Sequence, residues 1–115
     1  MNARHFSRVN AGIKIAVLVV TGLLSLSAAA SEALARKNDC LGCHAVATQL
    51  VGPAYKDVAA KYAGQSDAQA MLVQSIRSGS VGKWGDLPMP AHPKLSEADA
   101  KKLAAWVLKA KWQPL

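Results

Sequence analysis

The sequence predicts an all-α domain with three to four short helices. After residue 31, no stretch shows the alternation of apolar and polar residues that is typical of strands, and alanine and lysine are frequent. Apolar residues instead recur at helical spacing in short segments separated by glycine and proline. The chain has 115 residues and a mass of 12.1 kDa, which allows one hydrophobic core and excludes a multidomain enzyme.

The N-terminal segment has the order of a signal peptide. A polar, basic stretch comes first, an apolar uncharged run follows, and small residues close the segment at Ala30. We expect residues 1–30 to be cleaved, with cleavage after Ala35 as the alternative, and residues 31–115 to form a periplasmic domain. A retained membrane anchor is the other interpretation, but the uncharged run at 15–31 has 17 residues where about 20 are needed to span a bilayer.

The expected mature domain is mildly basic. The whole chain has a formal net charge of +7, while residues 31–115 carry 11 basic and 7 acidic groups, a net charge of +4. This excess is well short of what nucleic-acid binding requires. A domain of about 85 residues is close to the size at which a side-chain core alone is marginal, so we expect something else to help it fold.

Two helices are expected in the first half of the domain. Residues 31–39 begin with Ser and Glu and predict a first helix, which residues 40–44 continue or close. Residues 55–63 follow a Gly-Pro pair and end before Gly64, the residue type that commonly stands just past a helix end.

The second half predicts two more helices around a long loop. Ser66 is expected to cap a helix over 67–78, which Gly79 ends. Residues 79–94 contain three Gly and three Pro and are too interrupted for a helix, and a loop of this length in a small domain is usually functional or disordered. Ser96 opens the last helix as part of a capping box with Asp99.

The most specific motif is Cys40-Leu41-Gly42-Cys43-His44, a C-x-x-C-H at the spacing typical of c-type haem attachment. On a helical turn, residues three apart project to the same side, so both thiols reach the two vinyl groups on one edge of a porphyrin. His44 is then carried over the ring centre, where an imidazole nitrogen binds iron. We therefore expect Cys40 and Cys43 to hold haem and His44 to ligate its iron.

Three other interpretations of the motif remain open. A disulfide between Cys40 and Cys43 would close a very short loop and constrain little of the unfolded chain. A thioredoxin-like dithiol requires a βαβ setting, and no strands are predicted. A zinc site would have to recruit His92, with no paired histidine spacing to support it.

Met89 is the expected second iron ligand. It lies in Leu87-Pro88-Met89-Pro90, where two prolines stiffen the loop and so hold a thioether against iron with little ordering entropy. Met71 falls in a predicted helix and is interpreted as packing. His92 is either a second ligand or hydrogen-bond donor, or an ordinary loop residue on the surface.

Further residues are candidates for the haem environment. Trp84 and Lys83 are able to reach haem propionates through an indole N–H and an ammonium group, with a core position as the equal alternative for Trp84. The carbonyl of Pro53, or of a neighbour, is able to accept a hydrogen bond from the second ring nitrogen of His44 and so orient the ring.

Four stretches besides the C-x-x-C-H motif carry a family resemblance: Val51–Gln65, Trp84-Gly85, Pro88–Pro90 and Trp106–Leu108. With that motif they resemble the bacterial cytochrome c-551 family, also called cytochrome c8, which are small class I cytochromes c. The resemblance covers essentially the whole mature domain. It implies a class I cytochrome c fold, with three to four short helices packed around one covalently bound haem c.

The resemblance also implies a function. It indicates a monomeric periplasmic electron carrier of a respiratory chain, not an enzyme, which receives electrons from a cytochrome bc1-type complex or another cytochrome. The implied acceptors include nitrite reductase in denitrification, terminal oxidases and cytochrome c peroxidase. We expect lysines at the rim of an exposed haem edge to steer an acidic partner. The apolar residues expected around that edge are Val51, Pro53, Ala54, Pro88 and Ala91.

By the same resemblance, the Pro53 carbonyl accepts from His44, Trp84 donates to a propionate, and Met89 completes the iron ligands. The chain departs from the family at Ser75, where an Arg near a propionate is common, and at His92, where an Asn follows the ligand methionine. Two alternative functions remain: a haem-based peroxidase or gas sensor with an open sixth iron site, and a non-haem periplasmic dithiol protein.

Overall fold

The computed structural model describes residues 26–110. The chain divides into two compact units, Met1–Ala30 and Ser31–Leu115, so the signal peptide expected at 1–30 lies mostly outside the described residues and its cleavage stays a prediction. The described part of the second unit is all-α, as predicted, with a single isolated bridge in place of any strand. No helix in the described range is long and apolar enough to cross a membrane.

The first helix ends earlier than expected. Residues 26–37 are helical, and the Asn38 side chain closes the last turn because its Nδ2 donates to the Leu34 carbonyl at 2.8 Å. Asp39 then takes a left-handed conformation, with φ of 58°, and turns the chain into the 3-10 helix η1, Cys40–Gly42. The C-x-x-C-H motif therefore begins a separate turn and does not continue the helix.

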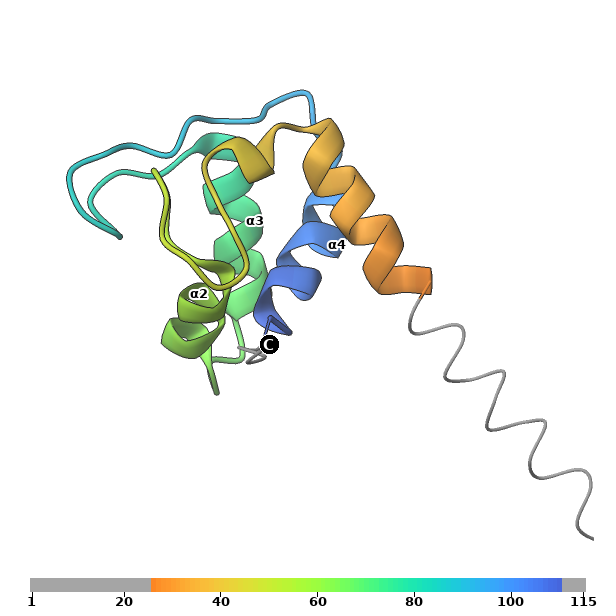
Figure 1. Cartoon of the computed structure of the whole chain (residues 1–115), viewed down its shortest axis with the longest axis horizontal. Helices are drawn as coiled ribbons and strands as arrows, with labels where there is room; N and C mark the ends of the chain where they lie inside the picture. Colours follow the sequence, from red (N-terminus) through yellow and green to blue (C-terminus); the bar gives the residue numbers. More distant parts are fainter. Residues whose placement is uncertain (1–25, 111–115) are drawn as a thin grey trace, which may run out of the picture. The chain divides into compact units, whose positions relative to one another are not determined.

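Helices α2 and α3 form close to their predicted positions (Figure 1). Helix α2 spans Tyr55–Tyr62 and is followed by Gly64 with a positive φ of 76°. Helix α3 spans Ala68–Ser78, and Gly79 ends it, as expected.

The predicted cap of α3 is wrong. Asp67, not Ser66, is the N-cap residue, and it makes no side-chain cap hydrogen bond. The physical reason is a backbone turn, in which the Ala68 N–H donates to the Gln65 carbonyl at 3.3 Å, so this donor at the helix start needs no side-chain oxygen.

Helix α4 spans Glu97–Leu108, and its Ser96 cap is confirmed. The Ser96 hydroxyl accepts from the Asp99 N–H at 3.1 Å. Helix α4 packs against both α2 and α3, and small and branched residues on its buried face allow this close approach: Ala100, Leu103, Ala104 and Val107.

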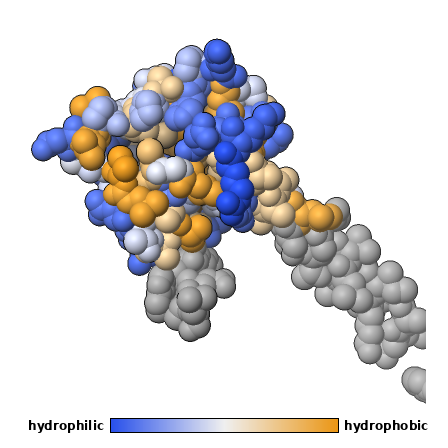
Figure 2. All heavy atoms as spheres, turned by 45° about the horizontal axis from the view of Figure 1, so that its top comes forward, coloured by the Kyte–Doolittle hydropathy of each residue, from blue (hydrophilic) through white to orange (hydrophobic). Residues whose placement is uncertain are grey.

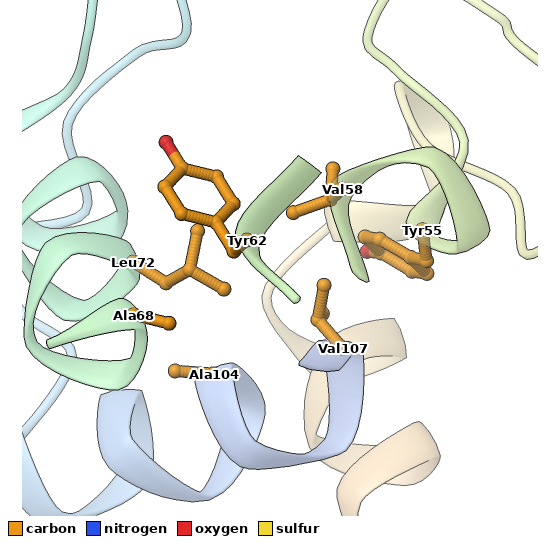
Figure 3. Packing of buried hydrophobic residues seen from close by; sticks show 7 residues of the cluster. All are labelled: Tyr55, Val58, Tyr62, Ala68, Leu72, Ala104 and Val107. Carbon is orange, nitrogen blue, oxygen red and sulfur yellow. The ribbon is translucent and has the colours of Figure 1, made fainter. Parts of the chain in front are cut away.

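The core consists of two clusters that share partly buried neighbours such as Trp106. The larger cluster joins α2, α3 and α4, and Figure 3 shows its members: Tyr55, Val58, Tyr62, Ala68, Leu72, Ala104 and Val107. The smaller cluster packs the N-terminal helix on α4: Ala35, Leu95, Ala100 and Leu103. Five of the twelve buried apolar residues are alanines, and no large side chain in the described residues is fully buried, so the core is thin.

The segment between α3 and α4, residues 79–94, is an irregular loop at the top of Figure 1. Its two arms are joined by an isolated antiparallel bridge between Ser80 and Met89, with hydrogen bonds of 3.1 and 2.8 Å. The His92 N–H donates to the Ile76 carbonyl at 3.0 Å, which attaches the end of the loop to α3. The loop is therefore held at defined points although it has no regular structure.

Candidate haem site

All six residues selected from the sequence line one cavity of about 300 Å³. They come from two distant stretches of the chain: Cys40, Cys43, His44 and Pro53 from the first, Trp84 and Met89 from the second. Side chains of α2, α3 and α4 complete its wall, including Val58, Leu72 and Val107. Tertiary folding therefore brings the C-x-x-C-H motif and the Pro-Met-Pro segment to the same site.

The two cysteines lie at the 3-10 turn, half-buried, and are not joined to each other. The Cys40 carbonyl accepts from the N–H groups of Cys43 and His44, at 3.2 and 2.9 Å, which fixes the motif as one tight turn. Burial, more than the nearby Asp39 carboxylate, raises the pKa of the Cys40 thiol. A raised pKa makes the reactive thiolate form less available at Cys40.

The His44 ring is oriented from two sides. Its Nδ1 lies 2.7 Å from the Pro53 carbonyl, and because a carbonyl only accepts, the proton is on Nδ1 and the lone pair on Nε2. The ring also stacks on Tyr55, with centroids 5.1 Å apart and planes inclined by 17°. Nε2 is consequently the ring nitrogen left to bind a metal.

Sequence reasoning missed Tyr55. This residue begins α2, its ring meets Trp106 edge-on at 5.3 Å, and burial raises the pKa of its phenol, which therefore stays neutral. Its only signal in the sequence is its place shortly after Gly52-Pro53. Since His44, Tyr55 and Trp106 follow one another in contact, α4 supports the histidine through two aromatic rings.

Met89 is half-buried in the cavity wall, and its backbone forms the bridge to Ser80. A Cβ on Gly79 would lie 2.8 Å from the Met89 carbonyl oxygen, so the start of the loop approaches the Met89 backbone as closely as only glycine permits. Met71, by contrast, packs against the larger core cluster and does not line the cavity, as its packing interpretation requires.

Trp84 is 39% exposed, so its alternative assignment to the core is wrong. The Lys61 ammonium lies 4.3 Å from the centre of the Trp84 ring and donates to the Lys83 carbonyl at 2.8 Å. The Lys83 ammonium in turn donates to the Ser75 hydroxyl at 3.0 Å. These contacts connect the loop to α2 and α3 at the cavity.

His92 also lines the cavity and is half-buried, with an Nδ1 that is enclosed and has no hydrogen-bond partner. The interpretation of an ordinary surface histidine is therefore wrong. A zinc site is also excluded for residues 26–110, where no three His, Cys, Asp or Glu side chains converge on a metal position.

This fold and this site define a small all-α protein with one haem-attachment motif in a cavity wall. Residues 28–111 match the family model of cytochrome c. The chain is 52% identical over 84 residues to cytochrome c-552 of Nitrosomonas europaea, covering 73% of this chain and 82% of that protein. It is 48% identical over 97 residues to cytochrome c-551 of Pseudomonas aeruginosa, covering 82% and 92%.

Solved structures agree with these relatives. The crystal structure of Nitrosomonas europaea cytochrome c552 superimposes with a TM-score of 0.68 at 52% identity, covering 70% of this chain and 99% of that one. A class 1 cytochrome from Sideroxydans lithotrophicus gives a TM-score of 0.62 at 36% identity, covering 70% and 92%. The chain belongs to the cytochrome c family and is a class I, monohaem c-type cytochrome.

Its cofactor is haem c, one per chain and covalently bound. The cavity fits this group: two free thiols lie on one tight turn, an imidazole beside them has Nε2 available, and the wall includes apolar side chains and a thioether. The chain has two cysteines in all, so these are the two available for covalent attachment.

Proposed function

We propose that this cytochrome is a one-electron carrier in which Cys40 and Cys43 form the thioether bonds and His44 and Met89 are the axial ligands. The observation that carries the proposal is the convergence of these four side chains on one cavity, with His44 already oriented by the Pro53 carbonyl. Haem supplies the one-electron change between Fe(III) and Fe(II). A thioether ligand favours Fe(II) and raises the potential relative to two histidines.

The chain's own residues keep the site closed to substrates. The Pro53 carbonyl and the Tyr55 ring hold His44 in one orientation, and the bridge to Ser80 holds the Met89 backbone. If His44 and Met89 both held the iron, no coordination position would remain for a substrate, and the protein would transfer electrons without acting as an enzyme. Little rearrangement accompanies each change of charge, which favours rapid transfer.

The surface supports brief contacts with redox partners. Exposed apolar side chains include Val51, Val81 and Leu87, with Val51 60% exposed, and Figure 2 shows hydrophobic patches next to hydrophilic residues. Ala54, expected among the apolar residues at the haem edge, is instead fully buried because it precedes α2 in the core. The excess of basic over acidic residues favours acidic partners in weak, short-lived complexes.

Within this proposal, the chain is a monomer of the periplasm, exported by a signal peptide at residues 1–30. A cytochrome bc1-type complex or another cytochrome donates its electrons. A nitrite reductase, a terminal oxidase or cytochrome c peroxidase accepts them, so the protein serves respiration or denitrification. The support for these assignments is the order of the N-terminal sequence and the similarity to cytochromes c-551 and c-552.

Visible spectroscopy of matched methionine variants tests the axial ligands. Leucine is similar in size to methionine but does not ligate iron, so Met89→Leu should open the sixth position and allow the ferrous protein to bind carbon monoxide. Met71→Leu is the control and should exclude carbon monoxide as the unmutated protein does. Carbon monoxide binding by the unmutated protein would instead indicate a peroxidase or sensor, and absence of haem absorbance would indicate a dithiol protein.

A further inference from the structure

Two lysines gather at the cavity without acidic partners. Lys61 comes from α2 and Lys83 from the loop, and Lys83 belongs to the cavity wall. The ion pairs within residues 26–110 are these: Arg36–Glu32, Lys101–Glu97 and Lys102–Asp99. The positive charges of Lys61 and Lys83 are therefore not balanced by any carboxylate in the part of the chain that the structure describes.

The position of Lys83 is constrained. Its ammonium donates to the hydroxyl of Ser75, a residue of α3 that is only 7% exposed and also lines the cavity. Its backbone carbonyl accepts from Lys61, which also covers the Trp84 ring. An exposed lysine normally keeps its ammonium in water, whereas this one is directed at a buried hydroxyl in the wall of the site.

An ammonium group has three N–H donors, and Ser75 uses one of them. The remaining two donors are free for other acceptors, and a charge-assisted hydrogen bond to an anion is stronger than one to a neutral group. The anionic groups of haem are its two propionates. We propose that Lys83, positioned by Ser75 and braced by Lys61, binds one haem propionate.

This inference rests on the proposed function, because it assumes haem in the cavity. It assigns a specific role to a position where this chain departs from the family it resembles. Where an arginine near a propionate is common, this chain has Ser75, and the cation instead comes from the loop and uses Ser75 as its anchor. A lysine acts here as a point charge, without the bidentate geometry of a guanidinium.

The expected effect is on the reduction potential. A propionate charge favours Fe(III), and the Lys83 ammonium offsets it, so Lys83→Met should lower the potential of the holoprotein. The equilibrium constant for reduction by a fixed mediator should fall by about threefold to tenfold, as expected for one partly screened unit charge. Lys94→Met removes the same charge from an exposed residue of the same loop outside the cavity wall, and should leave the potential nearly unchanged.

A second variant separates placement from charge. Ser75→Ala retains every charge and removes only the anchor, so it should lower the potential in the same direction by a smaller factor. Lys83→Arg keeps the positive charge and should retain most of the reduction potential of the unmutated protein. Infrared difference spectra of reduced minus oxidised protein should show a shifted propionate carboxylate band in Lys83→Met and not in Lys94→Met. If Lys83→Met acquires no haem, Lys83→Gln provides the same loss of charge with a polar end group.

Each result decides between this proposal and its alternatives. Equal potentials and carboxylate bands for Lys83→Met and Lys94→Met would overturn the proposal, and so would a change confined to the salt dependence of electron transfer, which would make Lys83 a partner-docking residue. An unchanged reduction potential in Ser75→Ala would show that Ser75 does not position the Lys83 ammonium. Carbon monoxide binding by the unmutated protein would refute the proposed pair of axial ligands. It would not refute the role of Lys83, because the reduction potentials of the variants would still test that role.

Discussion

At the scale of single residues, the site depends on how closely the chain approaches His44. A Cβ built on Gly52 would lie 2.5 Å from Cε1 and 2.8 Å from Nδ1 of the His44 ring. The Gly52 N–H also donates to the Cys43 carbonyl at 2.8 Å, so the backbone at this point cannot move away without losing a hydrogen bond. Gly52 is therefore required for steric reasons and not for turn formation.

We predict that Gly52→Ala displaces the His44 ring from the Pro53 carbonyl. The overlap should destabilise the holoprotein by about 1–3 kcal/mol, which is typical of an added methyl group in a packed site. Denaturant titration followed at the haem absorbance measures this loss. Gly42→Ala is the control, since an added Cβ there meets nothing within 4 Å, and equal stability of the two variants would contradict the steric argument.

At the scale of elements, the helix ends show which sequence signals operate. Ser96 and Ser66 are both serines placed just before a helix, yet only Ser96 makes a side-chain cap bond. The difference lies in the backbone: Ser96 has an extended conformation, with φ of −64° and ψ of 153°, which directs its hydroxyl at the Asp99 N–H. At the start of α3, a backbone turn in which the Ala68 N–H donates to the Gln65 carbonyl replaces the side-chain cap bond.

Ser96→Ala should consequently destabilise the protein by about 1 kcal/mol, the usual effect of losing an N-cap oxygen. Ser66→Ala should have an effect within about 0.5 kcal/mol, as for a surface position. Chemical unfolding of the two holoproteins compares them directly. A comparable loss in both variants would mean that the Ser66 side chain also stabilises α3.

The loop of residues 79–94 depends on Gly79 for two reasons. Its φ is 78°, which disfavours any residue with a Cβ, and a Cβ there would overlap the Met89 carbonyl oxygen at 2.8 Å. Gly64 has a similar φ of 76° but no neighbour within 4 Å. A substitution at Gly64 therefore tests backbone strain alone, whereas the same substitution at Gly79 tests strain together with contact with the Met89 backbone.

Gly64→Ala should cost about 1 kcal/mol of stability from strain alone. Gly79→Ala should cost more, and it should also disturb the bridge to Ser80 and weaken the Met89 ligand, so that the ferrous protein begins to bind carbon monoxide. Carbon monoxide titration and thermal unfolding provide the two measurements. If Gly79→Ala excluded carbon monoxide as fully as Gly64→Ala does, the bridge would not be what positions Met89.

At the scale of the whole molecule, the side chains alone make little core. The buried apolar residues are few and often alanine, and they surround a cavity of about 300 Å³ between the helices and the loop. An unfilled cavity of this kind costs free energy because its lining loses packing contacts. Haem therefore supplies a large part of the hydrophobic interior.

We predict that the chain is largely unfolded without its cofactor. The double variant Cys40→Ala/Cys43→Ala removes both thioether bonds, and purified free of haem it should show low helix content by far-UV circular dichroism and no cooperative melt. The control is Met89→Leu, which keeps haem attached and should retain its helices. A cooperative thermal transition in the haem-free variant would show that the protein core is sufficient by itself.

The local features of this protein were predictable from its amino-acid sequence. Helix class, both ends of α2, the start of α4 and the haem-attachment motif depend on residues within a few positions of one another, which is why periodicity, glycines and one serine cap predicted them. The chemistry of Pro53 and Trp84 made them candidates for the haem environment, the family resemblance assigned them the same roles, and both line the same cavity as the motif.

Contacts between residues distant in the sequence were not predictable in this way. The stacking of Tyr55 on His44, the enclosure of His92 and the bond from Lys83 to Ser75 depend on how helices and loop pack, and no local pattern encodes them. The same holds for the missing side-chain cap at Ser66 and the burial of Ala54, since backbone conformation and packing outweigh residue preference there. Local propensities select elements, whereas the side-chain surroundings of a site arise only when those elements are brought together.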